Sequence, residues 1–385
     1  MKENWTKKSV VWLAWILFLA CSGDDGVLDM GTGEGSGDLD SNTAPATREV
    51  IGNLSVPWEM LWGPDNLLWV TERGGRLSRI DPDTGEQSVV ADFSGIIEQS
   101  GESGLLGMAL HPDFSNNPWV YLVYTYRDGT TFNERLVRFS YANGSLGDAT
   151  VLLDNIPAGS RHSGSRIIID TANHILMTTG DAGDTRLSQD RNSLGGKLLR
   201  LNLDGSIPSD NPDPNSYIYT LGHRNPQGLM LHPNGMLYSS EHGPSTDDEI
   251  NIIQAGGNYG WPHVLGTINT LDEMAFAENT PVVESITDWT PTIAPSDLML
   301  YTSDRIPEWS NRLLMASLRE QTLFAITLNG DGTQVVERQR YFEGAFGRIR
   351  DLAMAPDGRL FLATNGTSFT DTGNTHSIIE INRLD

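Results

Sequence analysis

From about Glu49 to the C-terminus, short runs of aromatic and β-branched residues alternate with turns rich in glycine, proline, asparagine and aspartate. No long stretch has the period of an amphipathic helix, so the pattern predicts strands throughout. One unit recurs, a turn with proline or aspartate followed by a strand. It is found at Gly63–Glu72, His111–Tyr124, Asp170–Asp181, His232–Glu241, Ala355–Asn365 and, more loosely, Pro307–Ser317. A second strand follows each copy, at Arg76–Asp81, Arg135–Tyr141, Lys197–Leu203, Glu249–Gln254, Leu323–Leu328 and Ser377–Asn382.

Six copies of this unit, spaced several tens of residues apart, indicate repeated small antiparallel sheets. Because one small sheet cannot bury both of its faces, the sheets must pack against one another in a ring. We therefore predict an all-β fold, a six-bladed β-propeller with four-stranded antiparallel blades, over residues 48–385. The last strand falls at the C-terminus, so we expect the ring to close by bringing Glu49–Ser55 beside it.

The charge of the chain bears on its partners rather than on its fold. With 26 Lys and Arg against 50 Asp and Glu, the formal net charge is −24. Phosphate binding needs a basic surface, so this balance argues against nucleic acid as a partner. Cys21 is the single cysteine, so no disulfide can form within the chain.

Residues 1–20 have the pattern of an export signal. Three lysines precede an apolar run, Val10–Ala20, that ends in a small residue directly before Cys21. The run is too short to span a bilayer as a mature helix. This arrangement resembles the lipobox of bacterial lipoproteins, which implies a lipid anchor on Cys21. The alternative is an ordinary cleaved signal with an incidental thiol.

Residues 21–47 are rich in glycine, aspartate and serine and hold almost no large apolar side chain. This composition predicts a disordered tether. We thus expect an exported protein on the periplasmic side, attached to the membrane only through a lipid on Cys21.

The segment Leu221–Pro262 is the densest in polar residues suited to chemistry. It holds His-Arg-Asn, Glu-His-Gly-Pro, Asp-Asp-Glu and Gly-Gly-Asn-Tyr-Gly-Trp. Arginine and asparagine beside glycines suit an anionic or polar ligand. A Gly-Pro pair followed by carboxylates suits a hard cation such as calcium, which binds side-chain and carbonyl oxygens alike. The first hypothesis for this segment is therefore a metal-assisted site for a small molecule.

His162 is the candidate base. In a propeller, ligands bind at one mouth of the central channel, where loops join the inner strands. His162 leads into the third blade, and Asp181 lies at the far end of the strand that follows. A neutral imidazole can accept a proton from a hydroxyl group, and a neighbouring carboxylate would orient it and stabilise its charged form. The alternative is a histidine in a surface loop.

Arg348 and Arg350 flank Ile349 on a predicted inner strand or directly before it. Residues two apart on a strand point to the same side. Two arginines on one side of a strand, in a chain this acidic, suit the bidentate binding of an anion. Ion pairs with carboxylates of the blades are the alternative, and strand alternation does not decide between the two.

Six segments, taken in order, resemble the soluble quinoprotein glucose and sorbosone dehydrogenases, and most of all the aldose sugar dehydrogenases. The resemblance extends over essentially Glu49–Leu384. That family folds as a six-bladed propeller, which agrees with the repeat count. The segments are Gly104–Phe114, His162–Arg166, Gly195–Leu203, Gly222–Gln227, Gly243–Asn251 and Asn258–Pro262.

The resemblance implies pyrroloquinoline quinone as cofactor, a calcium ion bound against it, and an aldose as substrate. His162 would take the proton of the anomeric hydroxyl while hydride passes to the quinone, and Asp181 would orient the histidine. The carbonyl oxygens of Gly243 and Pro244 would hold the calcium ion, which polarises the quinone as a Lewis acid. An external electron acceptor, a cytochrome or a quinone, is also implied.

The same resemblance implies further contacts. Arg224 and Asn225 would contact the quinone and its substrate side, with Arg224 taking part in catalysis. A second, structural calcium ion would bind Glu249 and the carbonyl oxygen of Tyr259. The carboxylates that first suggested a metal are then structural, and the Gly-Pro backbone before them is the candidate for catalysis.

The remaining cofactor contacts include two departures from the glucose enzymes of this family. Arg348 and Arg350 would meet the carboxylates of the cofactor. Glu102 stands where a glutamine is usual beside substrate and cofactor, which adds a negative charge to a site that binds an anion. Arg319 stands where a lysine is usual, which keeps the charge but alters the geometry.

Two other functions stay open from the sequence. A calcium-dependent lactonase or other hydrolase on the same fold would use metal-bound carboxylates and no quinone. The His-Arg-Asn site and the paired arginines argue against it, because a lactonase does not need to neutralise several carboxylates. A propeller that binds sugar without turnover is the second alternative, and His162 together with Arg348 and Arg350 argues against that.

Overall fold

The computed structural model describes residues 46–366, 373 and 375–384. Cys21, the predicted signal at residues 1–20 and nearly all of the predicted tether lie outside the described residues. Nearly all of the regular secondary structure in the described residues is β-strand.

Twenty-four strands in the described residues form six sheets, each of four antiparallel strands, which confirms the predicted fold class. In blades one to five the strands follow chain order. The first blade holds β2 (Pro57–Trp62), β3 (Leu68–Glu72), β4 (Arg76–Ile80) and β5 (Gln87–Asp92), and the second holds β6 (Leu105–Leu110), β7 (Trp119–Asp128), β8 (Thr131–Ala142) and β9 (Ser145–Pro157). The third holds β10 (Gly164–Ile169), β11 (His174–Thr179), β12 (Lys197–Asn202) and β13 (Ile218–Leu221), and the fourth holds β14 (Pro226–Leu231), β15 (Leu237–Glu241), β16 (Asp248–Ile253) and β17 (Thr287–Trp289). The fifth holds β18 (Pro295–Tyr301), β19 (Arg312–Ser317), β20 (Leu323–Leu328) and β21 (Val335–Tyr341), and the sixth holds β22 (Ile349–Met354), β23 (Leu360–Thr364), β24 (His376–Ile381) and β1 (Thr47–Leu54).

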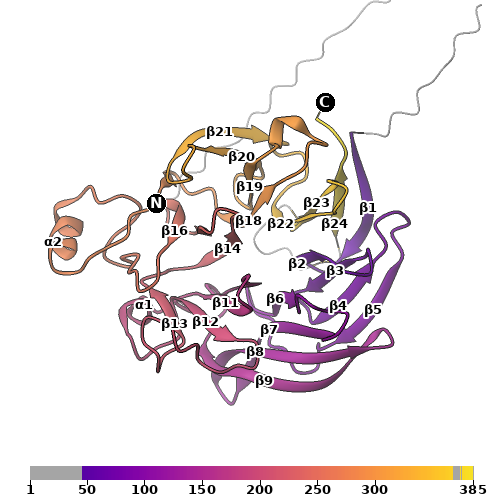
Figure 1. Ribbon diagram of the computed structural model, residues 1–385, viewed down its shortest axis with the longest axis horizontal. Helices are drawn as coiled ribbons and strands as arrows, with labels where there is room; N and C mark the ends of the chain where they lie inside the picture. Colours follow the sequence, from indigo (N-terminus) through magenta and orange to yellow (C-terminus); the bar gives the residue numbers. More distant parts are fainter. Residues whose placement is uncertain (1–45, 367–372, 374, 385) are drawn as a thin grey trace, which may run out of the picture. The chain divides into compact units, whose positions relative to one another are not determined.

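The first strands of consecutive blades form the inner wall of the ring. β2, β6, β10, β14, β18 and β22 each contact the first strands of the two neighbouring blades, and β22 returns to β2. Figure 1 shows the blades arranged around this centre. The inner strands therefore enclose one central channel.

The ring closes through the pairing of β1 with β24. The two strands are antiparallel, with Arg48 opposite Glu380. Nη2 of Arg48 lies 2.5 Å from Oε2 of Glu380, so an ion pair reinforces the ladder. The expectation that Glu49–Ser55 lies beside the last strand is thus confirmed.

The hydrophobic core is divided among the contacts between blades. Six buried apolar clusters are found, one between each pair of neighbouring blades. Between the first and second blades, Trp69 packs edge-on against Tyr141 with ring centroids 4.9 Å apart. Full burial of one large apolar side chain stabilises a fold by roughly 1.5–3 kcal/mol. The rigidity of the ring therefore comes from these sheet-to-sheet contacts.

Arg166 of β10 joins several blades at the channel axis. Its side chain is 2% exposed, and Nη1 lies 2.7 Å from both Oε1 of Glu59 on β2 and Oδ1 of Asp351 on β22. Nη2 lies 3.6 Å from Oδ1 of Asp297 on β18, and Nε donates to the carbonyl oxygen of Gln227 on β14 at 2.8 Å. One guanidinium group thus connects the third blade to four others.

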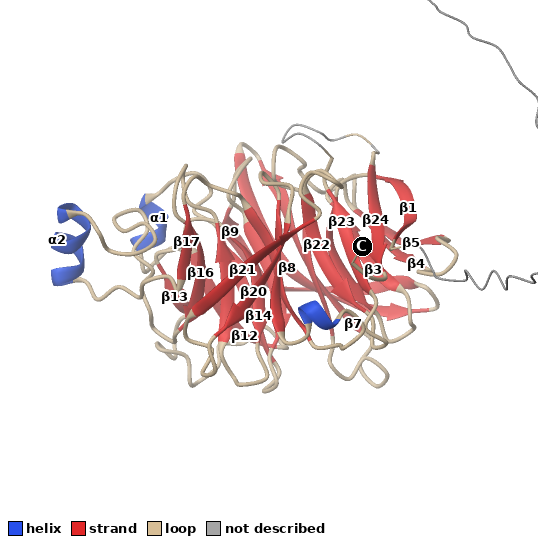
Figure 2. Cartoon of the chain, turned by 90° about the horizontal axis from the view of Figure 1, so that it is seen from above, coloured by secondary structure: helices blue, strands red, loops and turns tan. Residues whose placement is uncertain are grey.

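The helices lie outside the blades. They are α1 (Arg186–Gln189), α2 (Leu271–Asn279) and the short 3-10 helix η1 (Pro307–Trp309). Figures 1 and 2 show α2 in a segment that extends away from the ring between β16 and β17. In the described part of the chain, no helix combines the length and the hydropathy that a membrane span requires.

Candidate active site

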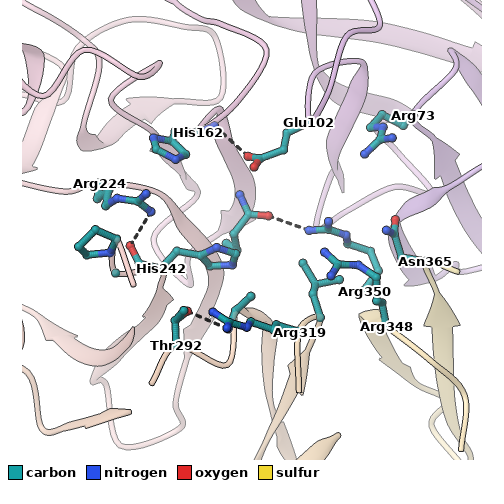
Figure 3. Close-up of a pocket in the computed structure, with 15 residues that line it drawn as sticks. Arg73, Glu102, His162, Arg224, His242, Thr292, Arg319, Arg348, Arg350 and Asn365 are labelled. Atoms are coloured by element: carbon teal, nitrogen blue, oxygen red, sulfur yellow. Dashed lines mark hydrogen bonds between the residues drawn. The ribbon is translucent and has the colours of Figure 1, made fainter. Parts of the chain in front are cut away.

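The side chains of the candidate site come from equivalent positions in different blades. Some directly precede the first strand of a blade, as Arg348 precedes β22; others follow the second strand, as His242 follows β15. In an antiparallel pair, the start of one strand and the end of the next lie at the same edge. These positions therefore meet at one mouth of the channel, where Figure 3 shows them around a cavity of about 300 Å³.

Most of the predicted site residues line this cavity. Asp181 and Asn225 instead lie behind the lining, in contact with His162 and Glu102 respectively. Glu249 and Tyr259 are not part of the lining. The predicted residues that do line it are Glu102, His162, Arg224, Gly243, Pro244, Arg319, Arg348 and Arg350.

His162 and Asp181 are in direct contact, with Nδ1 of the histidine 2.7 Å from Oδ1 of the aspartate. The expectation that one strand separates them is wrong: His162 precedes β10 and Asp181 follows β11, so a hairpin brings them together. A Cβ at Gly180 would lie 1.9 Å from the carbonyl oxygen of His162, so this close approach requires glycine. The histidine side chain is 14% exposed and faces the cavity, which does not fit an isolated surface histidine.

The carboxylate of Asp181 is buried and accepts three hydrogen bonds. Besides His162, the donors are the backbone N–H of Gly183 at 2.7 Å and Nε1 of Trp261 at 2.9 Å. Burial by itself opposes ionisation, but the hydrogen bond and charge of His162 outweigh it, so the pKa of Asp181 lies below its ordinary value. An ionised Asp181 fixes the proton of His162 on Nδ1 and leaves Nε2 as the acceptor.

Glu102 supports the loop that carries His162. Its Oε2 accepts from the backbone N–H of His162 at 2.8 Å and from Nδ2 of Asn225 at 3.4 Å. Oδ1 of Asn225 accepts in turn from the backbone N–H of Gly164 at 3.1 Å and from Nε2 of Gln227 at 3.0 Å. Glu102 and Asn225 therefore fix the backbone on both sides of Ser163, directly before β10.

Four arginines face the cavity with unsatisfied donors: Arg73, Arg224, Arg348 and Arg350. In the described residues, Nε of each one is buried without a hydrogen-bond partner, as is Nη2 of Arg73. Burial lowers the pKa of all four, that of Arg350 to about 9. Buried cations without counter-charges are unfavourable, so the cavity is suited to a ligand with several negative groups. For Arg348 and Arg350, this arrangement favours anion binding over ion pairs with the blades.

Five polar residues of the lining were not predicted: Arg73, Gln227, His242, Thr292 and Asn365. Nε2 of His242 lies 2.6 Å from the carbonyl oxygen of Pro295, which can only accept, so Nε2 carries the proton. Burial lowers the pKa of His242 to about 4, so this ring is neutral at pH 7. An alignment of the blades with one another would have found three of the five, because Arg73, His242 and Asn365 each follow the second strand of a blade.

The loop of Gly243 and Pro244 is held by Asp248. The carboxylate of Asp248 accepts from the backbone N–H of Gly243 at 2.7 Å and from those of Ile293 and Ala294 at 2.6 and 2.7 Å. Its oxygens are thus occupied by donors, so Asp248 serves to anchor this loop. Among the described residues, no backbone N–H donates to the carbonyl oxygens of Gly243 and Pro244, and both residues line the cavity.

Glu249 and Tyr259 lie in the fourth blade and beside it. Glu249 stands opposite Glu241 in the ladder, and its Oε1 accepts from the backbone N–H of Gly266 at 2.7 Å. Burial, together with the charge of Glu241, raises the pKa of Glu249 to about 8. The hydroxyl of Tyr259 donates to the carbonyl oxygen of Ile252 at 2.7 Å, so only its backbone oxygen is a candidate ligand. A cation beside Glu249 would relieve the repulsion between the two glutamates.

The lactonase alternative requires several metal-binding carboxylates. Within the described ranges, no group of three or more His, Cys, Asp and Glu could hold a metal ion. The lining of this cavity is rich in arginine, which suits an anionic ligand better than a site of metal-bound carboxylates.

Comparison with known proteins agrees with the geometry. The model of the glucose/sorbosone dehydrogenase family matches residues 54–370. Quinoprotein glucose dehydrogenase B of Acinetobacter calcoaceticus is 32% identical, over 86% of this chain and 88% of its own length. Aldose sugar dehydrogenase YliI of Escherichia coli is 32% identical, over 84% of this chain and 92% of its own.

Solved structures extend this similarity to three dimensions. The PQQ-bound form of the aldose sugar dehydrogenase from Streptomyces coelicolor aligns with a TM-score of 0.75 and 33% identity, over 87% of this chain and 98% of that one. The family match covers most of the chain, and the resemblance drawn from the sequence motifs is confirmed. This chain therefore belongs to the glucose/sorbosone dehydrogenase family.

Proposed function

We propose that this protein oxidises aldose sugars to lactones at the anomeric hydroxyl, using pyrroloquinoline quinone and calcium. One observation carries the proposal: the unpaired arginines and the His162–Asp181 pair meet in the same cavity. The arginines suit a polyanionic ligand, and the pair suits removal of a proton from a hydroxyl group. The names of the relatives, a quinoprotein glucose dehydrogenase and aldose sugar dehydrogenases, support the same activity.

The lining residues fit pyrroloquinoline quinone, which is a flat tricarboxylic acid. The cavity of about 300 Å³ lies at the low end of the usual range for small-molecule sites. Arg348, Arg350 and Arg73 would bind the carboxylates through N–H groups that now lack partners. Arg319, which is exposed at the rim, adds a further positive charge. When bound, the cofactor supplies an ortho-quinone that takes up the hydride of the sugar.

His162 is the base in this proposal. Because Nδ1 is engaged by Asp181, Nε2 is the nitrogen that would accept the proton of the anomeric hydroxyl. The ionised Asp181 stabilises the imidazolium that results. Arg224 would place a positive charge next to the oxygen on which negative charge develops. Asn225 would act mainly by holding the loop of His162, since it is 1% exposed.

Calcium would bind at two places. The carbonyl oxygens of Gly243 and Pro244 would hold one ion at the cavity, where it supplies Lewis-acid polarisation. Their freedom from backbone donors and the anchoring of their loop by Asp248 support this assignment. Glu249 and the carbonyl oxygen of Tyr259 would hold a second ion that stabilises the fourth blade, supported by the raised pKa of the buried Glu249.

Glu102 distinguishes this cavity from one lined by cations alone. Its negative charge acts to raise the pKa of four arginines, Arg73, Arg224, Arg348 and Arg350, against the effect of burial. The carboxylate would therefore weaken the binding of an anionic cofactor while it supports the loop of His162.

Export and a lipid anchor on Cys21 complete the proposal. Electrons would leave the protein to a cytochrome or a quinone in the membrane. The export signal and the anchor rest on the sequence pattern of residues 1–47.

The proposal is tested by reconstitution. The purified protein is loaded with calcium and pyrroloquinoline quinone and mixed with a panel of aldoses and an artificial dye. We expect quinone binding in near-stoichiometric amount and dye reduction that depends on both quinone and aldose. Absence of quinone binding, or dye reduction that does not depend on aldose, would contradict it.

A further inference from the structure

Trp261 touches the catalytic pair and the adjacent arginine at once. Its Nε1 donates to Oδ2 of Asp181 at 2.9 Å. The guanidinium carbon of Arg224 lies 5.3 Å from the centroid of its ring. The residue itself does not line the cavity. Any effect of Trp261 on the reaction therefore acts through Asp181 and Arg224.

The hydrogen bond from Trp261 determines how the carboxylate of Asp181 is turned. Oδ1 accepts from Nδ1 of His162 and from the backbone N–H of Gly183. For Oδ2, Trp261 is the one donor found in the described part of the chain. Without it, the carboxylate could rotate about its bond to Cβ, and the orientation of the imidazole would be less well determined. The second oxygen would also be buried without a partner, which is unfavourable.

The indole ring has a separate effect on Arg224. Among the residues that the structure describes, this guanidinium makes one hydrogen bond, from Nη1 to the carbonyl oxygen of His242 at 3.2 Å, and its Nε has no partner. A cation over an aromatic face is attracted by about 0.5–2 kcal/mol, depending on its desolvation. The ring of Trp261 therefore helps to hold Arg224 in place, beside the attraction of Asp181 and Glu102.

The backbone around Trp261 is itself firmly held. Its N–H donates to the carbonyl oxygen of Gly222 at 3.0 Å, and its own carbonyl oxygen accepts from Nε2 of Gln189 at 2.7 Å. The side chains of Gln189 and Asn258 also bind each other, at 2.8 and 3.0 Å. A Cβ at Gly222 would lie 2.2 Å from Oδ1 of Asn258, so glycine is required for this approach. The turn is thus anchored on two other segments of the chain, at Gln189 and at Gly222.

We propose that Trp261 is a positioning residue that fixes the carboxylate of Asp181 and the guanidinium of Arg224 in one geometry. The proposal rests on the proposed function, in which these two groups serve the base and the developing oxyanion. It assigns separate roles to two parts of one side chain. The N–H sets the direction of Asp181, and the ring face holds Arg224.

The test compares two substitutions in the full-length protein loaded with quinone and calcium. Trp261→Phe keeps an aromatic ring and removes the N–H donor. We expect kcat to fall about tenfold, with KM and quinone affinity changed by no more than about twofold, because only the orientation of the His162 ring is affected. Trp261→Leu removes both parts, so quinone affinity should fall as well.

The pH profile separates positioning from a general structural defect. The titratable and charged groups facing Asp181 are His162 and Arg224, with Glu102 behind the backbone of His162. Loss of the donor leaves more negative charge on Asp181 to face a protonated imidazole, so the acidic limb of kcat/KM, which reports the His162–Asp181 pair as a unit, should move to higher pH in Trp261→Phe. Trp289→Phe is the matched control, because Trp289 lies on β17 of the fourth blade and packs on Phe324 of the fifth blade. Its kinetics should equal those of the wild type.

The outcomes are distinguishable. A Trp261→Phe protein with the kcat and pH profile of the wild type would overturn the inference. So would a loss of kcat matched by equal losses in quinone affinity and thermal stability. If the wild type and Trp289→Phe fail to reduce dye with any aldose, the proposed function fails instead. The inference is then decided on the apoprotein, where the Nδ1 proton of His162, followed by NMR, should exchange faster in Trp261→Phe than in the wild type. Equal exchange would overturn it.

Discussion

His162 and Asp181 flank the open end of one β-hairpin, and Nδ1 of the histidine lies 2.7 Å from Oδ1 of the aspartate. We predict that Asp181→Asn lowers kcat by about 10²–10⁴-fold, because an amide can donate to Nδ1 and so favour the tautomer with its proton on Nε2. Quinone affinity should stay near that of the wild type. Steady-state kinetics and quinone titration check both parts.

The same substitution has a defined pH dependence in stability. The pKa of Asp181 in the folded protein lies below the ordinary value of 3.8. A depressed pKa stabilises the fold above the unfolded pKa, and this gain is lost as pH falls through the folded pKa. The difference in unfolding free energy between wild type and Asp181→Asn should therefore shrink as pH falls below about 4. A difference that grows with acid would contradict the assignment.

Arg350 should lower the stability of the apoprotein and strengthen the binding of the quinone. Burial lowers its pKa to about 9, and its Nε has no partner among the described residues. Arg350→Met should stabilise the apoprotein by about 1–2 kcal/mol, because the charges of Arg348 and Arg73 oppose that of this buried guanidinium more than Glu102 supports it. The same change should weaken quinone binding by roughly 10²-fold, because a cofactor carboxylate loses its partner. Thermal unfolding with and without quinone measures both effects.

Arg186→Met is the control for this experiment. Arg186 lies on α1, its side chain is 87% exposed, and its salt bridge is with Asp184. Its removal should change neither the stability of the apoprotein nor the quinone affinity measurably. If Arg350→Met destabilises the apoprotein, the claim that the buried charge of Arg350 lowers its stability is wrong.

Arg166 should be essential for stability rather than for chemistry. Arg166→Met leaves Glu59, Asp297 and Asp351 without their cation, which should lower the unfolding free energy by about 3–5 kcal/mol. Burial raises the pKa of Glu59 to about 7, and loss of Arg166 raises it further. A carboxyl that holds its proton longer in the folded state than in the unfolded state loses stability as pH rises. Denaturant unfolding should therefore show a smaller defect at pH 5 than at pH 8.

Calcium should stabilise the quinone-free protein through Glu249. In the wild type, calcium at a hundred times its Kd should add about 2.7 kcal/mol of stability, reversed by a chelator. Glu249→Gln removes a buried carboxylate beside Glu241, so the calcium-free variant should be at least as stable as the wild type. The gain from calcium should then largely disappear. Retention of the full gain in thermal unfolding would exclude Glu249 as a ligand.

The fold was predictable from the sequence because every blade repeats the same local pattern. Each turn-and-strand copy, including the looser Pro307–Ser317, corresponds to the second strand of a blade, and each partner run to the third. The closure by β1 followed from the position of the last strand at the C-terminus. Turn residues and strand alternation depend only on neighbouring residues, so the strands and their repeat could be predicted without knowledge of distant contacts.

The site was predictable where residue types were unusual for a loop, as at His162, Arg224 and the Arg348–Arg350 pair. Arg73 and Asn365 were not predicted because a single arginine or asparagine after a strand also suits an ordinary turn. Contacts such as that of Arg166 with Asp351, 185 positions apart, arise only when the ring closes. Trp261 belongs to the motif Asn258–Pro262, but its hydrogen bond to Asp181 depends on how the third and fourth blades meet.

The central claim is that His162 removes the proton of the sugar hydroxyl in a cavity that holds the quinone through its arginines. Anaerobic mixing of the quinone-loaded protein with excess glucose, followed by the absorbance of the bound quinone, tests it in a single turnover. The wild type should reduce the quinone rapidly. His162→Ala should bind the quinone with unchanged absorbance and reduce it about 10²–10⁴-fold more slowly. Reduction of the quinone by His162→Ala at the wild-type rate would contradict the account.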